Sequence, residues 1–302
     1  MGTEAGVEPQ PCLPPLAAPS KPRFVPPPLA CDSHIHLFGD SAIHKLDPDR
    51  SYTPPLATMA DADRLHSHLG FARCVIVHGS AYGANHAVML EALRAQPQRF
   101  RGVAVLRADT PNAMIKDLHE AGTRGFRVNL FQRHGKKVYR GGAGLEDAEA
   151  LAPKVRDLGW HVQAWLDAED LPELAPRLFA LGLDVVVDHM GRITTDRGIQ
   201  SPGFSYLRKQ LAAGKVWCKL SGADRITIAG PPYEDAVLYG RALMQANPDR
   251  VVWGTDWPHV NYFDGTIPDD GVLTDLIPRY APSAAEQKRL LVENPAKLYG
   301  FG

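Results

Sequence analysis

The fold is decided by the stretch Leu29-Ala-Cys-Asp-Ser-His34-Ile-His36-Leu-Phe-Gly39. A β-strand repeats every two residues, so His34 and His36 would point to the same face. Taken alone, the pair is as typical of polar residues that end a strand before the turn at Gly39 as it is of a functional site. Three later stretches favour a functional site, because each places polar residues directly after a short apolar run. They are Val187-Asp-His-Met-Gly-Arg192, Lys219-Leu-Ser-Gly-Ala-Asp-Arg225 and Trp253-Gly-Thr-Asp-Trp-Pro-His-Val-Asn261.

Short β-rich runs alternate with helical patterns from residue 30 onward. The expected strands are 30–36, 73–79, 101–107, 124–130, 160–166, 184–189, 216–221 and 251–255. The expected helices lie near 60–69, 84–95, 111–121, 146–158, 170–181, 203–213, 233–246 and 283–293. This alternation predicts an α/β fold, a (β/α)8 TIM barrel, and 302 residues suit one such domain.

The proline-rich segment 1–29 is expected to be an arm, and residues 30–302 a single catalytic barrel. A doubly wound open sheet is the alternative fold. No Gly-x-Gly-x-x-Gly follows a strand, which removes the usual dinucleotide-binding role of that alternative.

The composition limits the partners. A net charge of −1 and a pI near 6.9 predict no nucleic-acid partner and no anionic membrane surface. No apolar run approaches the roughly 18 residues that a membrane span needs. Cys12, Cys31, Cys74 and Cys218 are widely spaced, which favours reduced thiols in the cytoplasm. The sequence is compatible with a homo-oligomer and does not specify one.

In a barrel the carboxyl ends of all strands meet at one face, where the chemistry is found. The polar residues at the expected ends are His34, His36, His78, Ser80, Arg127, Asn129, Arg133, His189, Arg192, Lys219, Ser221, Arg225, Asp256, His259 and Asn261. One pocket is therefore expected to hold several arginines, a cluster of histidines and one carboxylate. His66 and His68 are also spaced His-x-His, but in a helical pattern, where residues two apart do not face each other. We expect both at the surface.

With these residues assembled, the chain resembles the amidohydrolase superfamily, in its amidohydrolase-2 branch, and within it the 2-pyrone-4,6-dicarboxylate lactonases of aromatic-compound degradation. The likeness also takes in residues 21–28, 69–77, 125–133 and 267–271. It implies that the catalytic cluster is His34, His36, His189 and Asp256. It implies that the substrate and its carboxylates are held by Tyr52, Ser80, Arg127, Arg133, Arg192, Arg225, His259 and Asn261. Trp165 departs from the pattern, since these lactonases carry a tyrosine there.

The metal ligands of this superfamily are incomplete in the sequence. A binuclear site needs a lysine at the end of the fourth strand and a histidine at the end of the fifth. Here those strands end in Arg127-Val-Asn129 and Trp165-Leu-Asp167. We expect no cofactor and no metal, because nearby arginines would repel a divalent cation. Zinc or manganese on His34, His36 and Asp256 is the minority alternative.

The resemblance implies a hydrolase that acts on the carboxylic ester bond of a small, carboxylate-bearing lactone. Asp256 would be the general base for water, and the three histidines would donate hydrogen bonds to the developing oxyanion. The arginines would clamp carboxylates, with one of them instead paired to a barrel carboxylate such as Asp188 or Asp224. An isomerase or hydrolase of a sugar-acid (aldaro)lactone is the second interpretation. A non-catalytic barrel that binds aromatic acids is the third.

Overall fold

The computed structural model describes residues 9–133, 136–138 and 142–302. It confirms the predicted (β/α)8 barrel. Eight parallel strands follow one another in the order β1, β2, β3, β4, β7, β8, β9 and β10. Their bounds are β1 (Cys31–Ile35), β2 (Arg73–Val77), β3 (Phe100–Ala104), β4 (Thr123–Asn129), β7 (His161–Trp165), β8 (Val185–Val187), β9 (Val216–Leu220) and β10 (Val251–Trp253). A short antiparallel pair, β5 (Gln132–Arg133) and β6 (Lys136–Lys137), follows β4.

The barrel closes between the first strand and the segment after the last. Ile35 pairs with Trp257 in a parallel bridge, and the amide of Asp256 donates to the carbonyl of His34 at 2.9 Å. The amide of His36 donates to the carbonyl of Trp257 at 2.8 Å. The seam therefore runs directly beside the His-x-His pair.

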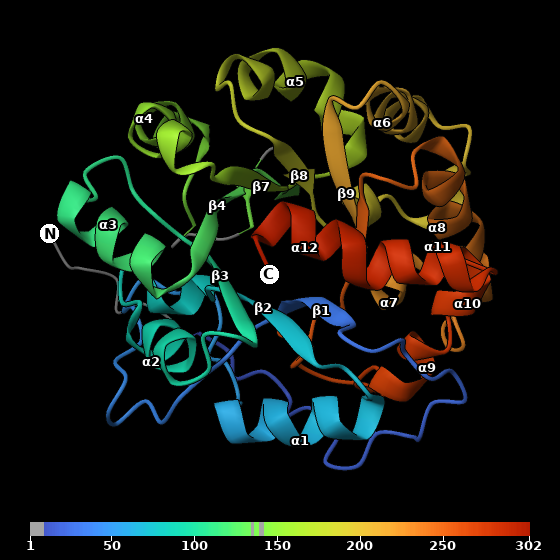
Figure 1. Ribbon diagram of the computed structural model, residues 1–302, viewed down its shortest axis with the longest axis horizontal. Coiled ribbons are helices and arrows are strands. Elements are labelled where there is room, and N and C mark those ends of the chain that lie inside the picture. Colours follow the sequence, from blue (N-terminus) through green and yellow to red (C-terminus); the bar gives the residue numbers. More distant parts are fainter. Residues whose placement is uncertain (1–8, 134–135, 139–141) are drawn as a thin grey trace, which may run out of the picture.

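The strands form a ring that helices surround (Figure 1). The helices are α1 (Met59–Leu69), α2 (Ala87–Ala95), α3 (Asn112–Ala121), α4 (Leu145–Val155), α5 (Leu171–Ala180), α6 (Pro202–Ala212), α7 (Ala223–Ile226), α8 (Glu234–Ala246), α9 (Asp270–Thr274), α10 (Ile277–Tyr280), α11 (Ala284–Lys288) and α12 (Asn294–Tyr299). All eight expected helices are present, with boundaries shifted by a few residues; α7, α9, α10 and α12 were not predicted. None of the helices in the described ranges is long and apolar enough to span a bilayer.

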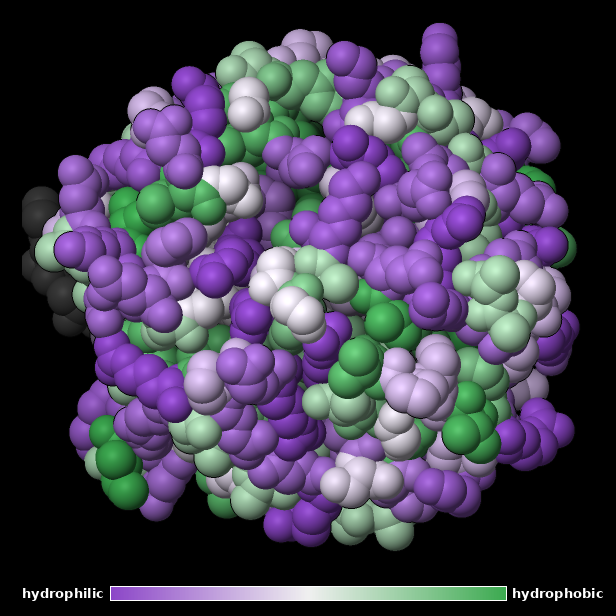
Figure 2. All heavy atoms as spheres, viewed as in Figure 1, coloured by the Kyte–Doolittle hydropathy of each residue, from purple (hydrophilic) through white to green (hydrophobic). Residues whose placement is uncertain are grey.

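Helix α12 lies across the end of the barrel where the strands begin (Figure 1). Its residues Leu298 and Tyr299 join a buried cluster with inward-facing strand residues such as Val75 and Trp217. Polar side chains cover most of this face of the molecule, and apolar side chains form small separate patches (Figure 2). The barrel is thus plugged at this end, which leaves the opposite end for a site.

The described part of the N-terminal arm packs against loops at the site end of the barrel. The amide of Cys12 donates to the carbonyl of Thr53 at 2.8 Å, and that of Leu13 to Tyr262 at 2.7 Å. Cys12 is buried, as are the other three cysteines, and all four are unpaired thiols. The arm therefore links two loops that border the cavity described next.

Candidate active site

A cavity of about 440 Å³ opens where the strands end. Nine of the residues predicted for the site line it: His36, Tyr52, Ser80, Arg127, His189, Arg192, Arg225, Asp256 and Asn261. The lining also includes Ser51, Phe131, Val138, Trp165, Val260 and Phe263. Ten of these fifteen residues are thus polar or charged, and three of the other five are aromatic.

Three histidines converge on one carboxylate oxygen. The Nε2 atoms of His34, His36 and His189 lie 3.6, 3.5 and 3.8 Å from Oδ1 of Asp256. The other oxygen, Oδ2, accepts a hydrogen bond from Nη2 of Arg225 at 3.2 Å. Burial opposes ionisation of Asp256, but the neighbouring histidines and Arg225 outweigh it and hold the pKa of this carboxyl well below its usual range. Asp256 is therefore a carboxylate at neutral pH.

Hydrogen bonds behind the rings determine their tautomers. Nδ1 of His36 lies 2.8 Å from the carbonyl oxygen of Val77, which only accepts, so Nδ1 carries the proton. Nε2 of His36 faces the cavity, 3.5 Å from Oδ1 of Asp256. Nδ1 of His189 lies 2.9 Å from the Ser221 hydroxyl, which can accept or donate.

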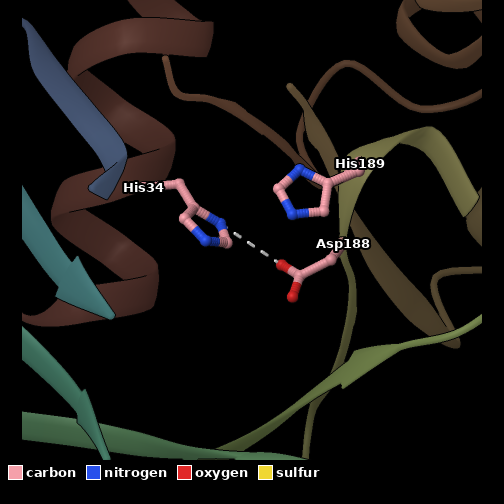
Figure 3. Close-up of side chains that lie close together, drawn as sticks. All are labelled: His34, Asp188 and His189. Atoms are coloured by element: carbon pink, nitrogen blue, oxygen red, sulfur yellow. Dashed lines mark ion pairs between the residues drawn. The ribbon is translucent and has the colours of Figure 1, made fainter. Parts of the chain in front are cut away.

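His34 is fully buried and lies beside Asp188, which directly follows β8 (Figure 3). Nδ1 of His34 is 3.5 Å from Oδ1 of Asp188, and both side chains are fully buried. Oδ2 of Asp188 accepts from Nε of Arg127 at 2.9 Å and from Gln163 at 3.1 Å. Burial opposes the charge on Asp188, but Arg127 and Lys219 overcome it and hold its pKa well below the ordinary value.

The backbone is strained where the site residues leave their strands. His189 and Asp256 have φ values of 51° and 69°, in the left-handed region that residues other than glycine rarely adopt. Each such residue costs of order 1–3 kcal/mol, and such residues cluster at functional sites. The turn explains why β8 and β10 end at Val187 and Trp253, two residues earlier than expected.

Asp32 anchors the strand that carries His34 and His36. Its Oδ1 accepts from the amides of His34 at 3.1 Å and Thr255 at 3.0 Å, and its Oδ2 lies 3.2 Å from Nε2 of His66. The prediction that His66 lies at the surface is wrong, because its side chain is only 1% exposed. It lies on the apolar stripe of α1 with Ala62, Leu65 and Leu69, a spacing that could have revealed its burial.

Two arginines, and not one, pair with barrel carboxylates. Arg127 binds Asp188, and Nε of Arg225 lies 3.2 Å from Oδ2 of Asp224. The guanidinium of Arg192 lies over the rings of Phe131 and Trp165, with its carbon 5.4 and 6.0 Å from their centroids. The side chain of Arg133 lies outside the described residues.

His259 is not at the cavity. Its side chain is fully buried, and its Nε2 lies 3.0 Å from Oδ1 of Asp270 on α9. This position corrects its assignment as a substrate contact. Conversely, the assigned sites did not include Asp188 and Lys219, which the structure places directly beneath His34.

Comparisons with known proteins agree with this geometry. The model of the amidohydrolase family matches residues 31–301. The chain belongs to the amidohydrolase family. It is 40% identical over 292 residues to the 2-pyrone-4,6-dicarboxylate hydrolase of Comamonas testosteroni, with 94% of each chain covered. It is 35% identical over 298 residues to the 4-sulfomuconolactone hydrolase of Rhizobium radiobacter, with 98% of each covered. A crystal structure of an Agrobacterium tumefaciens protein matches with a TM-score of 0.80 and 28% identity, over 93% of this chain and 99% of that one.

Zinc or manganese on His34, His36 and Asp256 is the alternative that the sequence leaves open, so the fit of a cation needs a test. Ligand atoms of His34, His36 and Asp256 lie within 4.8 Å of one another, as do those of His34, Asp188 and His189. The spacing suits three ligands. The surroundings do not, because Nζ of Lys219 is 3.3 Å from Nδ1 of His34 and Nη2 of Arg225 is 3.2 Å from Asp256. These positive charges oppose the binding of a divalent ion.

Proposed function

We propose that this amidohydrolase hydrolyses the ester bond of a small carboxylate-bearing lactone without a metal ion, with 2-pyrone-4,6-dicarboxylate or a close analogue as its substrate. The observation that carries the proposal is the convergence of three histidine Nε2 atoms on one oxygen of Asp256, in a cavity bordered by arginines. The names of the two curated relatives, both lactone hydrolases, support the same class of reaction.

Asp256 acts as the general base. Its carboxylate takes a proton from water while the water oxygen bonds to the lactone carbonyl carbon. Nε2 of His36 lies 3.5 Å from the same carboxylate oxygen, so His36 is placed to orient that water by a hydrogen bond.

His189 lines the cavity and donates to the carbonyl oxygen as it becomes an oxyanion, and His34 lies behind it with Nε2 3.6 Å from Asp256. Burial lowers the pKa of His189 to about 4, so its ring is neutral at pH 7 and has one N–H to donate. Donors of this kind typically contribute about 10²–10³ in rate. When the ring C–O bond breaks, protonated Asp256 returns its proton to the leaving oxygen, which completes the addition of one water.

The arginines bind the carboxylates of the substrate. Arg192 lies on an aromatic wall of Phe131 and Trp165, which suits a flat ring bearing a negative charge. Arg225 contacts Asp256 and therefore lies where a carboxylate next to the reacting carbon would be held. The arrangement favours a planar acid over an uncharged lactone.

The experiment is a comparison of two substrates in ¹⁸O-labelled water, with proton release followed by pH-stat. For 2-pyrone-4,6-dicarboxylate, we expect one ¹⁸O in the product and one proton released per turnover. An aldarolactone converted without ¹⁸O uptake or proton release would establish the isomerase instead. Binding of either acid without turnover would favour the non-catalytic barrel and contradict the proposal.

A further inference from the structure

Lys219 is a fully buried lysine near the carboxyl end of β9. Its Nζ has three acceptors around it: the carbonyl oxygen of Ser33 at 2.9 Å, Nδ1 of His34 at 3.3 Å and Oδ1 of Asp188 at 3.7 Å. An ammonium group has three protons and no lone pair. The carbonyl of Ser33 and Nδ1 of His34 lie within hydrogen-bond distance of this donor, and Oδ1 of Asp188 lies at ion-pair distance.

We propose that Lys219 is a positioning residue that holds His34 in the tautomer protonated on Nε2, so that His34 donates a hydrogen bond toward Asp256 and offers no lone pair to a metal ion. The inference rests on the proposed function for its catalytic consequence only.

The argument follows from the donor count. A proton on Nδ1 of His34 would point at an ammonium that can only donate, 3.3 Å away. With Nδ1 as the acceptor, the single proton of the neutral ring belongs to Nε2, which faces Asp256 at 3.6 Å. Burial together with the charge of Lys219 holds the pKa of His34 well below its usual range, so the ring is neutral. Burial lowers the pKa of Lys219 to about 8, which still leaves it mostly charged at pH 7.

Asp188 is the competing partner of Nδ1, at 3.5 Å (Figure 3). It is farther from Nδ1 than the ammonium is, and it is already neutralised by Arg127 at 2.9 Å. Without the lysine, Asp188 would be the polar group that faces Nδ1. The proton of the ring would then lie on Nδ1 and donate a hydrogen bond to Asp188. Nε2 would then carry a lone pair.

That change would alter the whole cluster. The carbonyl of Val77 holds a proton on Nδ1 of His36, so Nε2 is the atom of that ring that could bind a metal ion. A lone pair on Nε2 of His34 would add a third ligand atom to those of His36 and Asp256. Asp188 would then lie behind His34 and hydrogen-bond its other ring nitrogen, as carboxylates do in many zinc sites. Lys219 thus determines whether these residues form a hydrogen-bonding cluster or a metal site.

The first test is ¹⁵N NMR of protein labelled at histidine, without substrate, at pH 7. The His34 signals are assigned by their loss in His34→Gln. We expect a protonated Nε2 and an unprotonated Nδ1 in the wild-type protein, and the reverse in Lys219→Met. A wild-type ring protonated on Nδ1 overturns the proposal, whether or not the variant folds.

The second test is zinc affinity, measured by competition with a chelating dye. We expect Lys219→Met to bind Zn²⁺ at least about tenfold more tightly than wild type, and His34→Gln in the same background to remove the gain. Lys116→Met, which changes an exposed lysine on α3, is the control and should bind as wild type does. Destabilisation alone cannot create a site, so equal affinity of Lys219→Met and wild type overturns the proposal.

Hydrolysis distinguishes this inference from the proposed function. In metal-free buffer, Lys219→Met should lose about 10²–10³ in kcat, as much as the loss of one catalytic hydrogen-bond donor, because His34 then no longer donates toward Asp256. An Nε2-protonated His34 in a protein that hydrolyses no lactone would contradict the function alone. Full metal-free activity with an Nδ1-protonated His34 would overturn the role of Lys219 alone.

Discussion

The hydroxyl oxygen of Thr255 lies 2.6 Å from Oδ2 of Asp32, and this contact joins the segment after the last strand to the first. Both residues are fully buried. The next residue after Thr255 is the candidate base, and the strand of Asp32 continues into His34 and His36. The position of the base relative to the histidines therefore depends on this hydrogen bond.

Thr255→Val keeps the shape of the side chain and removes the hydroxyl. Because a buried carboxylate oxygen loses a donor, we expect the free energy of unfolding to fall by about 1–3 kcal/mol. Urea unfolding measures the change, and Thr266→Val on an exposed loop is the control. A loss no greater than that of the control would mean that the contact does not hold the seam together.

Asp256→Asn removes the base and keeps the size of the side chain. We expect kcat for lactone hydrolysis to fall by about 10²–10⁴, the usual contribution of general base catalysis. Asp264→Asn, on the exposed loop after the cavity wall, should leave the rate unchanged. Retention of more than a tenth of the activity in Asp256→Asn would assign the base to another group.

Arg192→Lys keeps the charge but loses the flat guanidinium that lies over Phe131 and Trp165. Lysine cannot bind a carboxylate with two parallel hydrogen bonds. We expect KM to rise about tenfold, equivalent to about 1.4 kcal/mol of binding, with kcat little changed. Arg64→Lys on the exposed face of α1 is the matched control. An unchanged KM would place the substrate carboxylate elsewhere.

The stability of the barrel should fall as the pH falls below neutrality. His161 begins β7, far from the site, and burial lowers its pKa to about 3. Between about pH 6.5 and pH 3 the unfolded chain takes up a proton at His161 that the folded chain does not. Lowering the pH through this window therefore stabilises the unfolded state relative to the folded state. In that window His161 lowers the free energy of unfolding by about 1.4 kcal/mol for each pH unit of acidification.

His161→Gln removes this proton uptake. Urea unfolding of both proteins at pH 7, 6 and 5 should show a shallower pH dependence in the variant, by about one proton. Equal slopes in the two proteins would show that His161 titrates normally in the folded barrel.

The sequence was sufficient for the barrel and for most of the pocket, because period-two strands and strand ends are local features. The spacing of His66 and His68 does not reveal that His66 is buried. Its spacing from the apolar residues Ala62 and Leu69, four before it and three after it, does. The position of His259 does not follow from its place after a strand end, because its ring packs against Asp270 on α9, a contact that the sequence does not show.

Lys219 was visible in the sequence as a lysine inside an apolar strand. Its partners were not, because Ser33, His34 and Asp188 come from two other strands of the barrel. The proton positions on His34 and His36 depend on such contacts across the barrel. Sequence spacing alone therefore brought the histidines together but did not establish which of them donates.

The most direct measurement is the loss of 2-pyrone-4,6-dicarboxylate absorbance on chelator-treated protein, with and without added zinc or manganese, beside Asp256→Asn under the same conditions. The metal-free mechanism predicts full turnover after chelation, no gain from either ion, and loss of turnover in the variant. Activity that vanishes on chelation and returns only with zinc or manganese would contradict it and make His34, His36 and Asp256 ligands.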